Sequence, residues 1–218
     1  LDPTYDTRDA FLSGQVLDAQ ARLNAANLIA DGKVSATAVA SFTRLFTLLG
    51  LQPDMATELA AQMQKAQASS AGESAPLMPR RMEDLVWLGL PQAVVPLLAP
   101  YVTLLPTTTP VNLNTASAEV IYAAVPELDL AAAQRLVGTR NQAYFKDTAT
   151  ALASVAPPGL TPDPGWTAVS SSFFEVRGRL RLDQVALEEV SAVRRDPASG
   201  QVTALWRERT AIGVPVPR

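Results

Sequence analysis

The sequence contains no cysteine and no histidine among its 218 residues. Without cysteine the chain can form no disulfide, no thiolate metal site and no thiol nucleophile. Without histidine it lacks the usual general base near neutral pH, the usual partner of a catalytic serine and a common zinc or iron ligand. The serines at 170–172 have no G-x-S-x-G or S-x-x-K context that would support a nucleophile. The sequence therefore predicts a protein that is not an enzyme.

Charge is also scarce, because charged residues make up 18% of the chain and the formal net charge is -3. The 18 lysines and arginines form no dense run that could follow a phosphate backbone, which argues against nucleic-acid binding. No apolar run approaches the roughly 20 residues that cross a bilayer, and the opening LDPTYDTRD lacks a signal-peptide core. We expect the chain as given to be soluble. Because it begins without an initiator Met, we also expect an upstream segment to have been removed.

Residues 7–26 carry apolar side chains at helical spacing. The intervals are four, three and four along the series Leu12, Val16, Ala19 and Leu23. This spacing places them on one stripe and predicts an amphipathic helix. The next residues, RLNAANLIADGK, end in an Asp31-Gly32 turn and are compatible with a short strand.

Two further helices are predicted between residues 35 and 66. Ser35 can cap the first helix and Gly50 is placed to end it, while Asp54 can cap the second. The residues expected on their buried faces are Val39, Phe42, Phe46, Leu49, Leu59 and Met63. The small and polar segment 67–80 then has the composition of a flexible connector.

A weak internal repeat follows, in which residues 84–91 (DLVWLGLP) match residues 119–126 (EVIYAAVP) at an offset of 35. An acidic residue, two apolar residues, an aromatic residue and a final apolar-proline pair recur in register. A second apolar-periodic run follows each copy, so the pattern predicts two helix–turn–helix hairpins. Asn114 or Thr115 is expected to cap the first helix of the second hairpin. A weaker half copy covers residues 150–157.

The second hairpin begins with VNLNTAS, residues 111–117, which is similar to the start of a DNA-binding helix-hairpin-helix unit. Such a unit needs glycines in its turn and cations nearby, so that backbone N–H groups and positive charge hold a phosphate. Here the turn lacks glycine and carries Glu127 and Asp129, and the nearest basic residues are Arg135 and Arg140. We therefore interpret the hairpin as a packing unit, with DNA binding as the alternative.

After about residue 165 the hydrophobic period changes from helical to alternating. One side of the segment 173–182 is apolar and the other is charged: Phe174, Val176, Leu180 and Leu182 against Glu175, Arg177, Arg179 and Arg181. We interpret the arginines as a solvated face with Glu188 and Glu189 as cross-strand partners. The alternative is an anion site, with Phe173 as a contact point. Turns at 182–184 and 196–200 complete an antiparallel meander of three predicted strands.

Helices followed by strands indicate an α+β chain. A three-stranded sheet with one apolar face needs a covering element, and the amphipathic first helix is the natural candidate. We therefore expect residues 1–32 (a helix and a first strand) and 161–218 (an antiparallel sheet) to form one domain. Residues 33–160 then form an inserted helical domain.

Taken in order, these segments resemble the K-type minor pseudopilin of the bacterial type II secretion system, the general secretion pathway protein K family. The resemblance covers most of the chain. Its most specific part is the succession of PYVTLLP and PVNLNTA. The matching segments are FLSGQVLDAQARLN (11–24), LLGL (48–51), LAPYVTLLPTTTPVNLNTASAEVI (98–121), AQRLVGTRN (133–141) and SSSFFEVRGRLRL (170–182).

This resemblance implies a pseudopilin fold: a long N-terminal helix packed on a small antiparallel sheet, with a large inserted all-α domain that contains the helix-hairpin-helix-like units. It implies a role in assembly rather than catalysis, at the tip of the pseudopilus, where the protein would start and cap the fibre with the I and J minor pseudopilins. The outer-membrane secretin and secreted substrates are further partners that it suggests. It also implies a periplasmic location and, in the full-length protein, an anchor in the inner membrane of a Gram-negative bacterium.

The exposed part of the first helix is the expected partner surface, because its length gives it apolar positions beyond those that a three-stranded sheet can cover. The residues assigned to this surface are Phe11, Leu12, Val16 and Ala19. No cofactor is expected. Some members of the family bind calcium near an aspartate-rich stretch, but residues 67–80 contain Glu73 as their one acidic residue, and no D-x-D-x-D-G spacing occurs.

Overall fold

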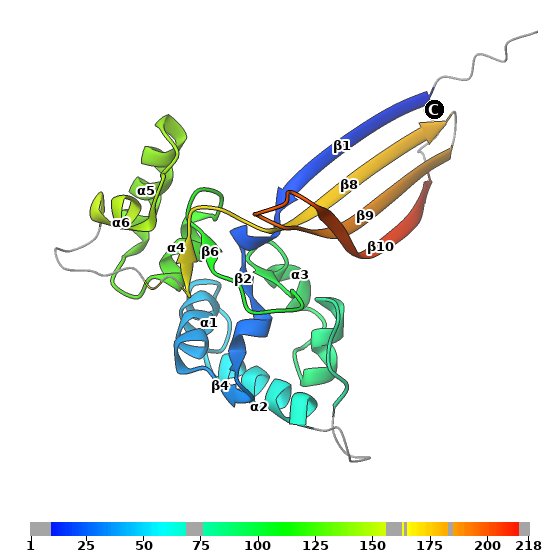
Figure 1. Ribbon diagram of the computed structural model, residues 1–218. Helices are drawn as coiled ribbons and strands as arrows, with labels where there is room; N and C mark the ends of the chain where they lie inside the picture. The colour runs from blue at the N-terminus through cyan, green and yellow to red at the C-terminus, as the bar shows by residue number, and fades with distance from the viewer. Residues whose placement is uncertain (1–9, 69–75, 156–162, 164, 183–184, 214–218) are drawn as a thin grey trace, which may run out of the picture. The chain divides into compact units, whose positions relative to one another are not determined.

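The computed structural model describes residues 10–68, 76–155, 163, 165–182 and 185–213, which form helices and an antiparallel sheet (Figure 1). The fold is therefore α+β, as predicted. The chain divides into two compact units. The first, which we call the sheet unit, consists of Leu1–Ala19 and Ser172–Arg218, and the second, the helical unit, consists of Gln20–Ser171.

The helical unit is larger than the insertion 33–160 that the sequence predicted, because short strand pairs draw further residues into it. Strand β2 (Leu23–Asn24) pairs in parallel with β5 (Val102–Thr103). Likewise β7 (Thr167–Ala168) pairs in parallel with β6 (Val111–Asn112). Residues before 33 and after 160 therefore belong to the helical unit. The predicted boundaries 33 and 160 were wrong, because the unit begins at Gln20 and ends at Ser171.

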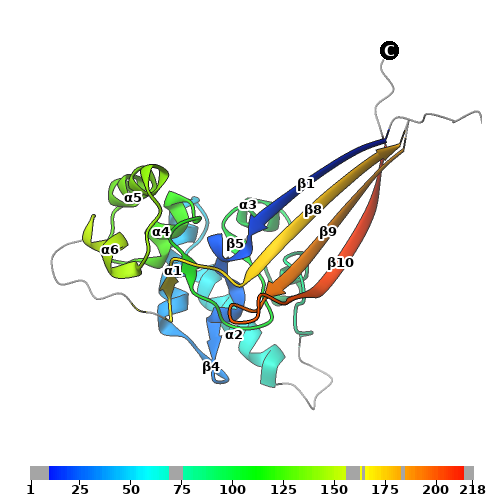
Figure 2. The same ribbon diagram turned by 45° about the horizontal axis from the view of Figure 1, so that its top comes forward.

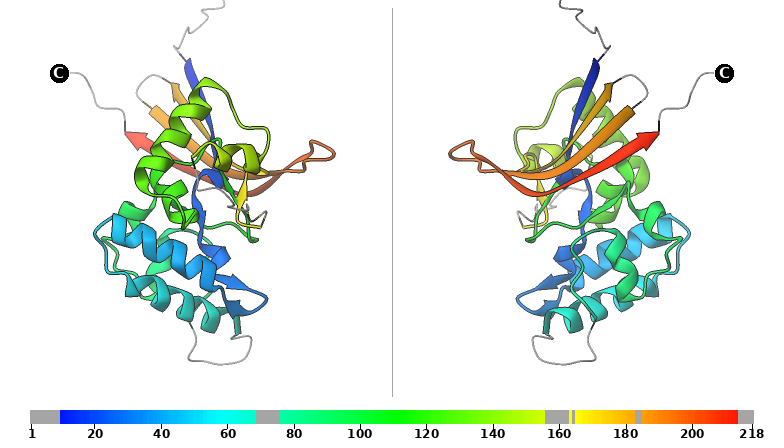
Figure 3. Two further views of the ribbon diagram at one scale, coloured as in Figure 1. Left: turned by 90° about the vertical axis from the view of Figure 1, so that its left-hand side faces the viewer. Right: turned by 90° about the vertical axis from the view of Figure 1, so that its right-hand side faces the viewer.

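The sheet unit contains four antiparallel strands in the order β1-β8-β9-β10 (Figure 2). They are β1 (Ala10–Asp18), β8 (Phe173–Leu182), β9 (Val185–Arg195) and β10 (Val202–Gly213). The last three form the predicted meander, and the hairpin of β9 and β10 is seen in orange to red in Figure 3. The predicted turn at 182–184 lies partly outside the described residues.

The helix predicted for residues 7–26 is wrong, because the described part of this segment begins with strand β1 and continues into the single-turn 3-10 helix η1 (Ala19–Ala21). All nine residues of β1 pair with β8. The interval of four between Leu12 and Val16 is an even number, so these side chains share a face in a strand as well as in a helix. Tertiary pairing thus overrides the helical pattern.

Two helices start the helical unit, α1 (Ala36–Leu48) and α2 (Asp54–Ala68). The Ser35 hydroxyl accepts a hydrogen bond from the Ala38 N–H at 3.3 Å, and Gly50 ends the first helix at φ 71°, so both predicted boundaries of α1 are confirmed. Phe42 and Phe46 pack edge to face in a core with the following fully buried side chains: Leu23, Leu28, Leu45, Leu59, Met63, Leu85, Leu98, Leu113, Ile121 and Leu136.

The predicted repeat forms two helical hairpins. The first joins the 3-10 helix η3 (Glu83–Leu88) to α3 (Val95–Leu98), with Gly89 at φ 93° after the first helix. The second joins α4 (Ala118–Ala124) to α5 (Leu130–Gln142), and α6 (Thr148–Ala153) follows. The remaining short elements are η2 (Ala25–Leu28), β3 (Ile29–Ala30) and β4 (Lys33–Val34).

Two buried asparagines fasten the loop that precedes the second hairpin. The Asn24 amide donates to the Thr107 carbonyl at 2.8 Å and accepts from the Leu105 N–H at 3.0 Å. The Asn27 amide donates to the Thr109 carbonyl at 2.8 Å and accepts from the Thr109 N–H at 2.9 Å. Because both side chains are almost fully buried, these bonds satisfy side-chain amides that water cannot reach.

Arg44 of α1 holds the second hairpin against the first helix. Its guanidinium donates to the Tyr122 carbonyl at 2.8 Å and to the Leu128 carbonyl at 2.8 Å. It also lies 4.0 Å from the centre of the Tyr122 ring, which is a cation–π distance. One cation therefore satisfies carbonyls on both sides of the turn between α4 and α5.

Candidate partner-binding surface

The sheet has one apolar face, on which side chains of β1, β8 and β9 are aligned by the strand register. On β1 and β8, Leu12 lies opposite Leu180 and Val16 lies opposite Val176. The exposed fraction is 81% for Leu12, 66% for Val16 and 43% for Leu180. We call this surface the apolar face and define it by Leu12, Val16, Phe174, Val176, Leu180, Leu182, Leu187 and Val193. Exposed aliphatic groups aligned in this way are typical of an interaction surface.

A pair of glycines interrupts the apolar face at its middle. Gly14 and Gly178 lie opposite each other in the register of β1 and β8. Neither has positive φ. A Cβ added at Gly178 would meet no atom within 4 Å, and one at Gly14 would meet only the Arg177 carbonyl, at 3.8 Å. The pair therefore leaves space where another backbone can approach the sheet closely.

The four residues predicted to bind a partner do not form one surface. Leu12 and Val16 lie together on the apolar face, whereas Phe11 projects from the opposite face, where the Arg181 guanidinium lies 4.4 Å from its ring centre. Ala19 is 4% exposed. The single stripe predicted on a helix is therefore wrong: a strand alternates its faces, which separates Phe11 from Leu12, and burial removes Ala19 from any partner surface.

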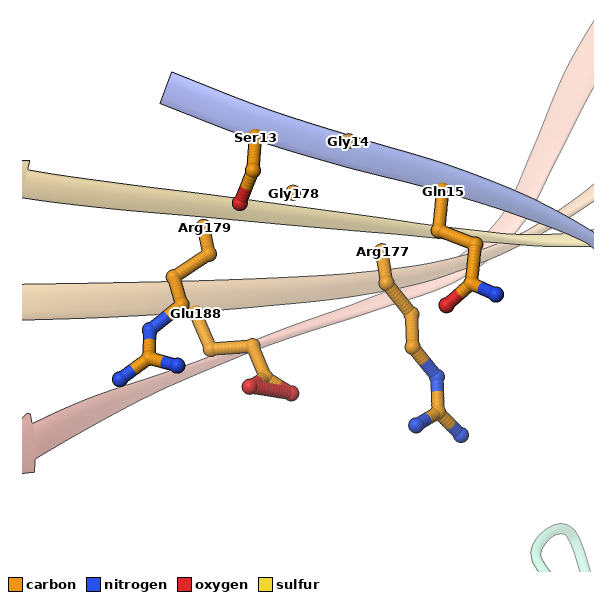
Figure 4. Close-up of a pocket in the computed structure, with 7 residues that line it drawn as sticks. All are labelled: Ser13, Gly14, Gln15, Arg177, Gly178, Arg179 and Glu188. Carbon is orange, nitrogen blue, oxygen red and sulfur yellow. The ribbon is translucent and has the colours of Figure 1, made fainter. Parts of the chain in front are cut away.

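The opposite face of the sheet is polar and contains a groove with a volume of about 370 Å³ (Figure 4). As predicted, the β8 arginines share this face. Arg177 binds Glu175 of the same strand at 2.6 Å. Glu188 lies opposite Arg179 in the register, on the same face. The residues that line the groove are Ser13, Gly14, Gln15, Arg177, Gly178, Arg179 and Glu188.

Glu189 does not belong to this polar face, although the sequence predicted it as a partner of the same arginines. The strand alternation places it on the apolar side, where its carboxylate binds Arg209 at 2.6 Å and Arg207 at 3.1 Å. The hydrogen bond from Arg209 and the charge of Arg207 lower the pKa of Glu189. This ion triad ties β9 to β10 at the far side of the sheet from β1.

A DNA-binding hairpin would bind phosphate at the start of its second helix with a free cation nearby. In the second hairpin here, a carboxylate lies at the start of α5, and the nearby arginine is already hydrogen-bonded to the protein. The Asp129 carboxylate accepts from the Ala132 N–H at 2.6 Å and so caps α5. Arg140 donates to the Leu113 and Ala116 carbonyls, and burial lowers its pKa. The capping carboxylate and the engaged guanidinium both argue against the DNA-binding alternative.

The VNLNTAS segment is held by its asparagines and capped later than predicted. Asn114 donates to the Phe145 carbonyl at 2.8 Å and to the Val169 carbonyl at 3.0 Å, so its amide serves the loop and not the helix. Ser117 instead caps α4, accepting from the Val120 N–H at 3.4 Å. The prediction of Asn114 or Thr115 as the cap was therefore wrong.

The described residues carry neither a cluster of metal ligands nor a membrane-spanning helix. Within those residues, no group of three or more acidic side chains is close enough together to hold a metal ion. None of the helices in the described ranges has both the length and the apolar character needed to cross a bilayer.

Comparisons with known proteins agree on one family. Residues 21–107 and 111–170 match two family models, both described as type II secretion system (T2SS), protein K. The type II secretion system protein K of Pseudomonas aeruginosa is 26% identical over 222 residues, which covers 93% of this chain and 66% of that protein. The chain thus spans about two thirds of the length of this curated relative.

A solved structure shares the fold. A chain in the crystal structure of the GspK-GspI-GspJ complex from the enterotoxigenic Escherichia coli type 2 secretion system is similar with a TM-score of 0.66. The match covers 94% of this chain and 84% of that one at 17% identity. The α+β fold is therefore common to both chains.

Proposed function

The chain belongs to the type II secretion system protein K family, a group of minor pseudopilins that are structural components of a secretion machine, and we propose that it acts at the tip of the pseudopilus. In this role it starts the fibre and caps it, and it performs no catalysis. The observation that carries the proposal is the agreement of the two family models with a fold shared over 94% of the chain.

Two features of the chain support a structural role. The sequence has neither histidine nor cysteine, which removes the commonest catalytic bases and nucleophiles. The inserted unit Gln20–Ser171 is much larger than the sheet unit into which it is inserted. A unit of this size would obstruct the stacking of another subunit beyond it, which is what a cap requires.

The proposed partners are the I and J minor pseudopilins. The neighbouring crystal structure is titled as a GspK-GspI-GspJ complex, and the fold of one of its chains is shared here. The apolar face is the surface we assign to helix packing or subunit contact, with Leu12 and Val16 at its most exposed edge. The secretin and secreted substrates are further proposed partners, and we place the protein in the periplasm with an inner-membrane anchor in its full-length form.

Deletion and complementation test the proposal. In the bacterium that carries it, deletion of the full-length gene is expected to stop export of an enzyme that uses the type II pathway, leaving that enzyme in the periplasm. Complementation with the full-length gene is expected to restore export. A gene whose product lacks Gln20–Ser171 serves as the comparison, provided that immunoblotting shows it at normal abundance. Unchanged export in the deletion strain would contradict the proposal.

A further inference from the structure

The two edges of the sheet differ in how they are protected against pairing with another strand. Strand β10 carries a bulge between Ala204 and Trp206, followed by the charged run Arg207, Glu208 and Arg209. Bulges and charged side chains are the usual means by which proteins prevent an edge from accepting a foreign strand. The β10 edge is therefore protected.

The β1 edge has none of these protections. Its nine residues pair with β8 in unbroken register, and the sequence AFLSGQVLD contains no proline, no lysine and one charged residue, Asp18, at its end. No described strand pairs with the outer edge of β1. A straight, uncharged edge of this length offers its backbone N–H and C=O groups to an added strand.

The polar groove lies beside this edge and is lined by two arginines and one glutamate. Ser13 and Gln15 of β1 project toward it on the same side as Arg177 and Arg179 of β8 and Glu188 of β9 (Figure 4). Arg179 makes no ion pair within the described part of the chain, although Glu188 lies opposite it in the register. The groove thus contains the Arg179 guanidinium, which can bind a carboxylate of another protein. Closer to the edge it contains the Ser13 hydroxyl and the Gln15 amide.

We propose that the outer edge of β1 binds an extended segment of another protein, which adds to the sheet as a fifth strand and directs acidic side chains into the groove. A strand alternates its side chains between two faces. Every second residue of the added strand therefore faces the arginines, and the residues between extend the apolar face beside Leu12 and Val16. The preferred ligand is an extended segment in which acidic and aliphatic residues alternate. This inference does not depend on the proposed function.

Fluorescence anisotropy with a labelled synthetic peptide of alternating valine and glutamate tests this directly. We expect saturable binding to the full chain, and Arg179→Gln is expected to weaken it about tenfold because one charge-assisted hydrogen bond is lost. Arg195→Gln makes the same change of charge on the opposite face of the sheet and is expected to leave the affinity unchanged. Equal effects of the two substitutions, or no binding of the peptide, would overturn the proposal.

Strand addition is distinguished from simple charge attraction by methylating the peptide backbone. Two versions of the probe carry N-methyl groups on alternate amides, one on the odd residues and one on the even. Because a strand directs alternate N–H groups to opposite edges, we expect one version to lose binding and the other to retain it. Equal binding of both versions, or equal affinity for a single-stranded DNA of the same charge, would instead indicate a non-specific cation patch and overturn the proposal.

Discussion

Leu12 of strand β1 lies opposite Leu180 of strand β8, and both aliphatic side chains are exposed on the same face of the sheet, Leu12 more than Leu180. Val16 and Val176 form the next apolar pair beyond two facing glycines. The sheet unit therefore presents aliphatic side chains on both sides of the two glycines, where no side chain covers the backbone. This combination fits a packed helix or a neighbouring subunit better than it fits free contact with water.

Substitution of Leu12 and Val16 is expected to affect assembly more than stability. The double change Leu12→Ser and Val16→Ser removes two apolar side chains that are already exposed, so the thermal midpoint of the chain should change little. If a partner covers these side chains, its affinity should fall at least about tenfold, since burial of one such side chain contributes roughly 1.5–3 kcal/mol. Titration calorimetry against the I and J minor pseudopilins measures the change.

Val202→Ser is the matched control for that experiment. Val202 is also an exposed aliphatic residue, but it lies on β10, at the other edge of the sheet. Its substitution should leave the affinity unchanged. An equal loss of affinity in the control and in the double variant would show that partner binding does not depend on the β1 side of the apolar face.

Substitution of Asn24 is expected to destabilise the helical unit. Its buried amide forms hydrogen bonds with Leu105, Thr107 and Thr109, so Asn24→Ala removes this partner from the buried Leu105 N–H and Thr109 hydroxyl. We expect a loss of about 2–4 kcal/mol in the free energy of unfolding, measured by urea denaturation. The control is Asn141→Ala on the exposed surface of α5, which should change this free energy by less than about 0.5 kcal/mol. Similar losses in both variants would contradict this role for Asn24.

Arg140 is expected to stabilise the second hairpin rather than to bind a ligand. Arg140→Met keeps an unbranched apolar stem but leaves the Leu113 and Ala116 carbonyls without their donor. The free energy of unfolding should fall by about 1–3 kcal/mol. Arg135→Met on the exposed side of the same helix should cost much less. If Arg140→Met unfolds at the same urea concentration as the parent chain, the hydrogen bonds of Arg140 do not stabilise the fold.

The Glu189 triad makes the sheet unit sensitive to acid. Because Arg209 and Arg207 lower the pKa of Glu189 in the folded state, its ion pairs stabilise the fold above the ordinary glutamate pKa. This stabilisation is lost as the pH falls through the lowered folded-state pKa, so the decline is expected in the range below the ordinary glutamate pKa of about 4.3. Glu189→Gln should therefore reduce the pH dependence of the urea midpoint in that range. Glu188→Gln, on the other face, is the control, and identical pH profiles of Glu189→Gln and the parent chain would refute the triad's role.

The helices and the meander were predictable because their signals are local. Ser35 and Gly50 mark the ends of α1 within the sequence itself, and the alternation after Phe173 has the period of a strand. The same holds for the two hairpins, whose repeat is visible in the sequence at residues 84–91 and 119–126. Local chemistry alone therefore gives most of the helical unit and three strands of the sheet.

Strand β1 was not predictable from local pattern, and this changed the candidate site. The spacing of Leu12 and Val16 is compatible with a helix and with a strand. The partner strand β8, which decides between the two, comes after the whole helical unit in the sequence. The groove was missed for the same reason, because it needs Ser13 and Gln15 on a strand beside Arg177 and Arg179. The alternating charges of β8 were the one signal of it in the sequence.

Size-exclusion chromatography with light scattering, applied to this chain mixed with the periplasmic regions of the I and J minor pseudopilins, tests the proposed role most directly. A minor pseudopilin of the K type should elute with both partners as one complex, with a mass equal to the sum of the three chains. Elution of this chain alone, at its own mass of 23.2 kDa and at concentrations where I and J bind each other, would contradict the proposed place at the pseudopilus tip.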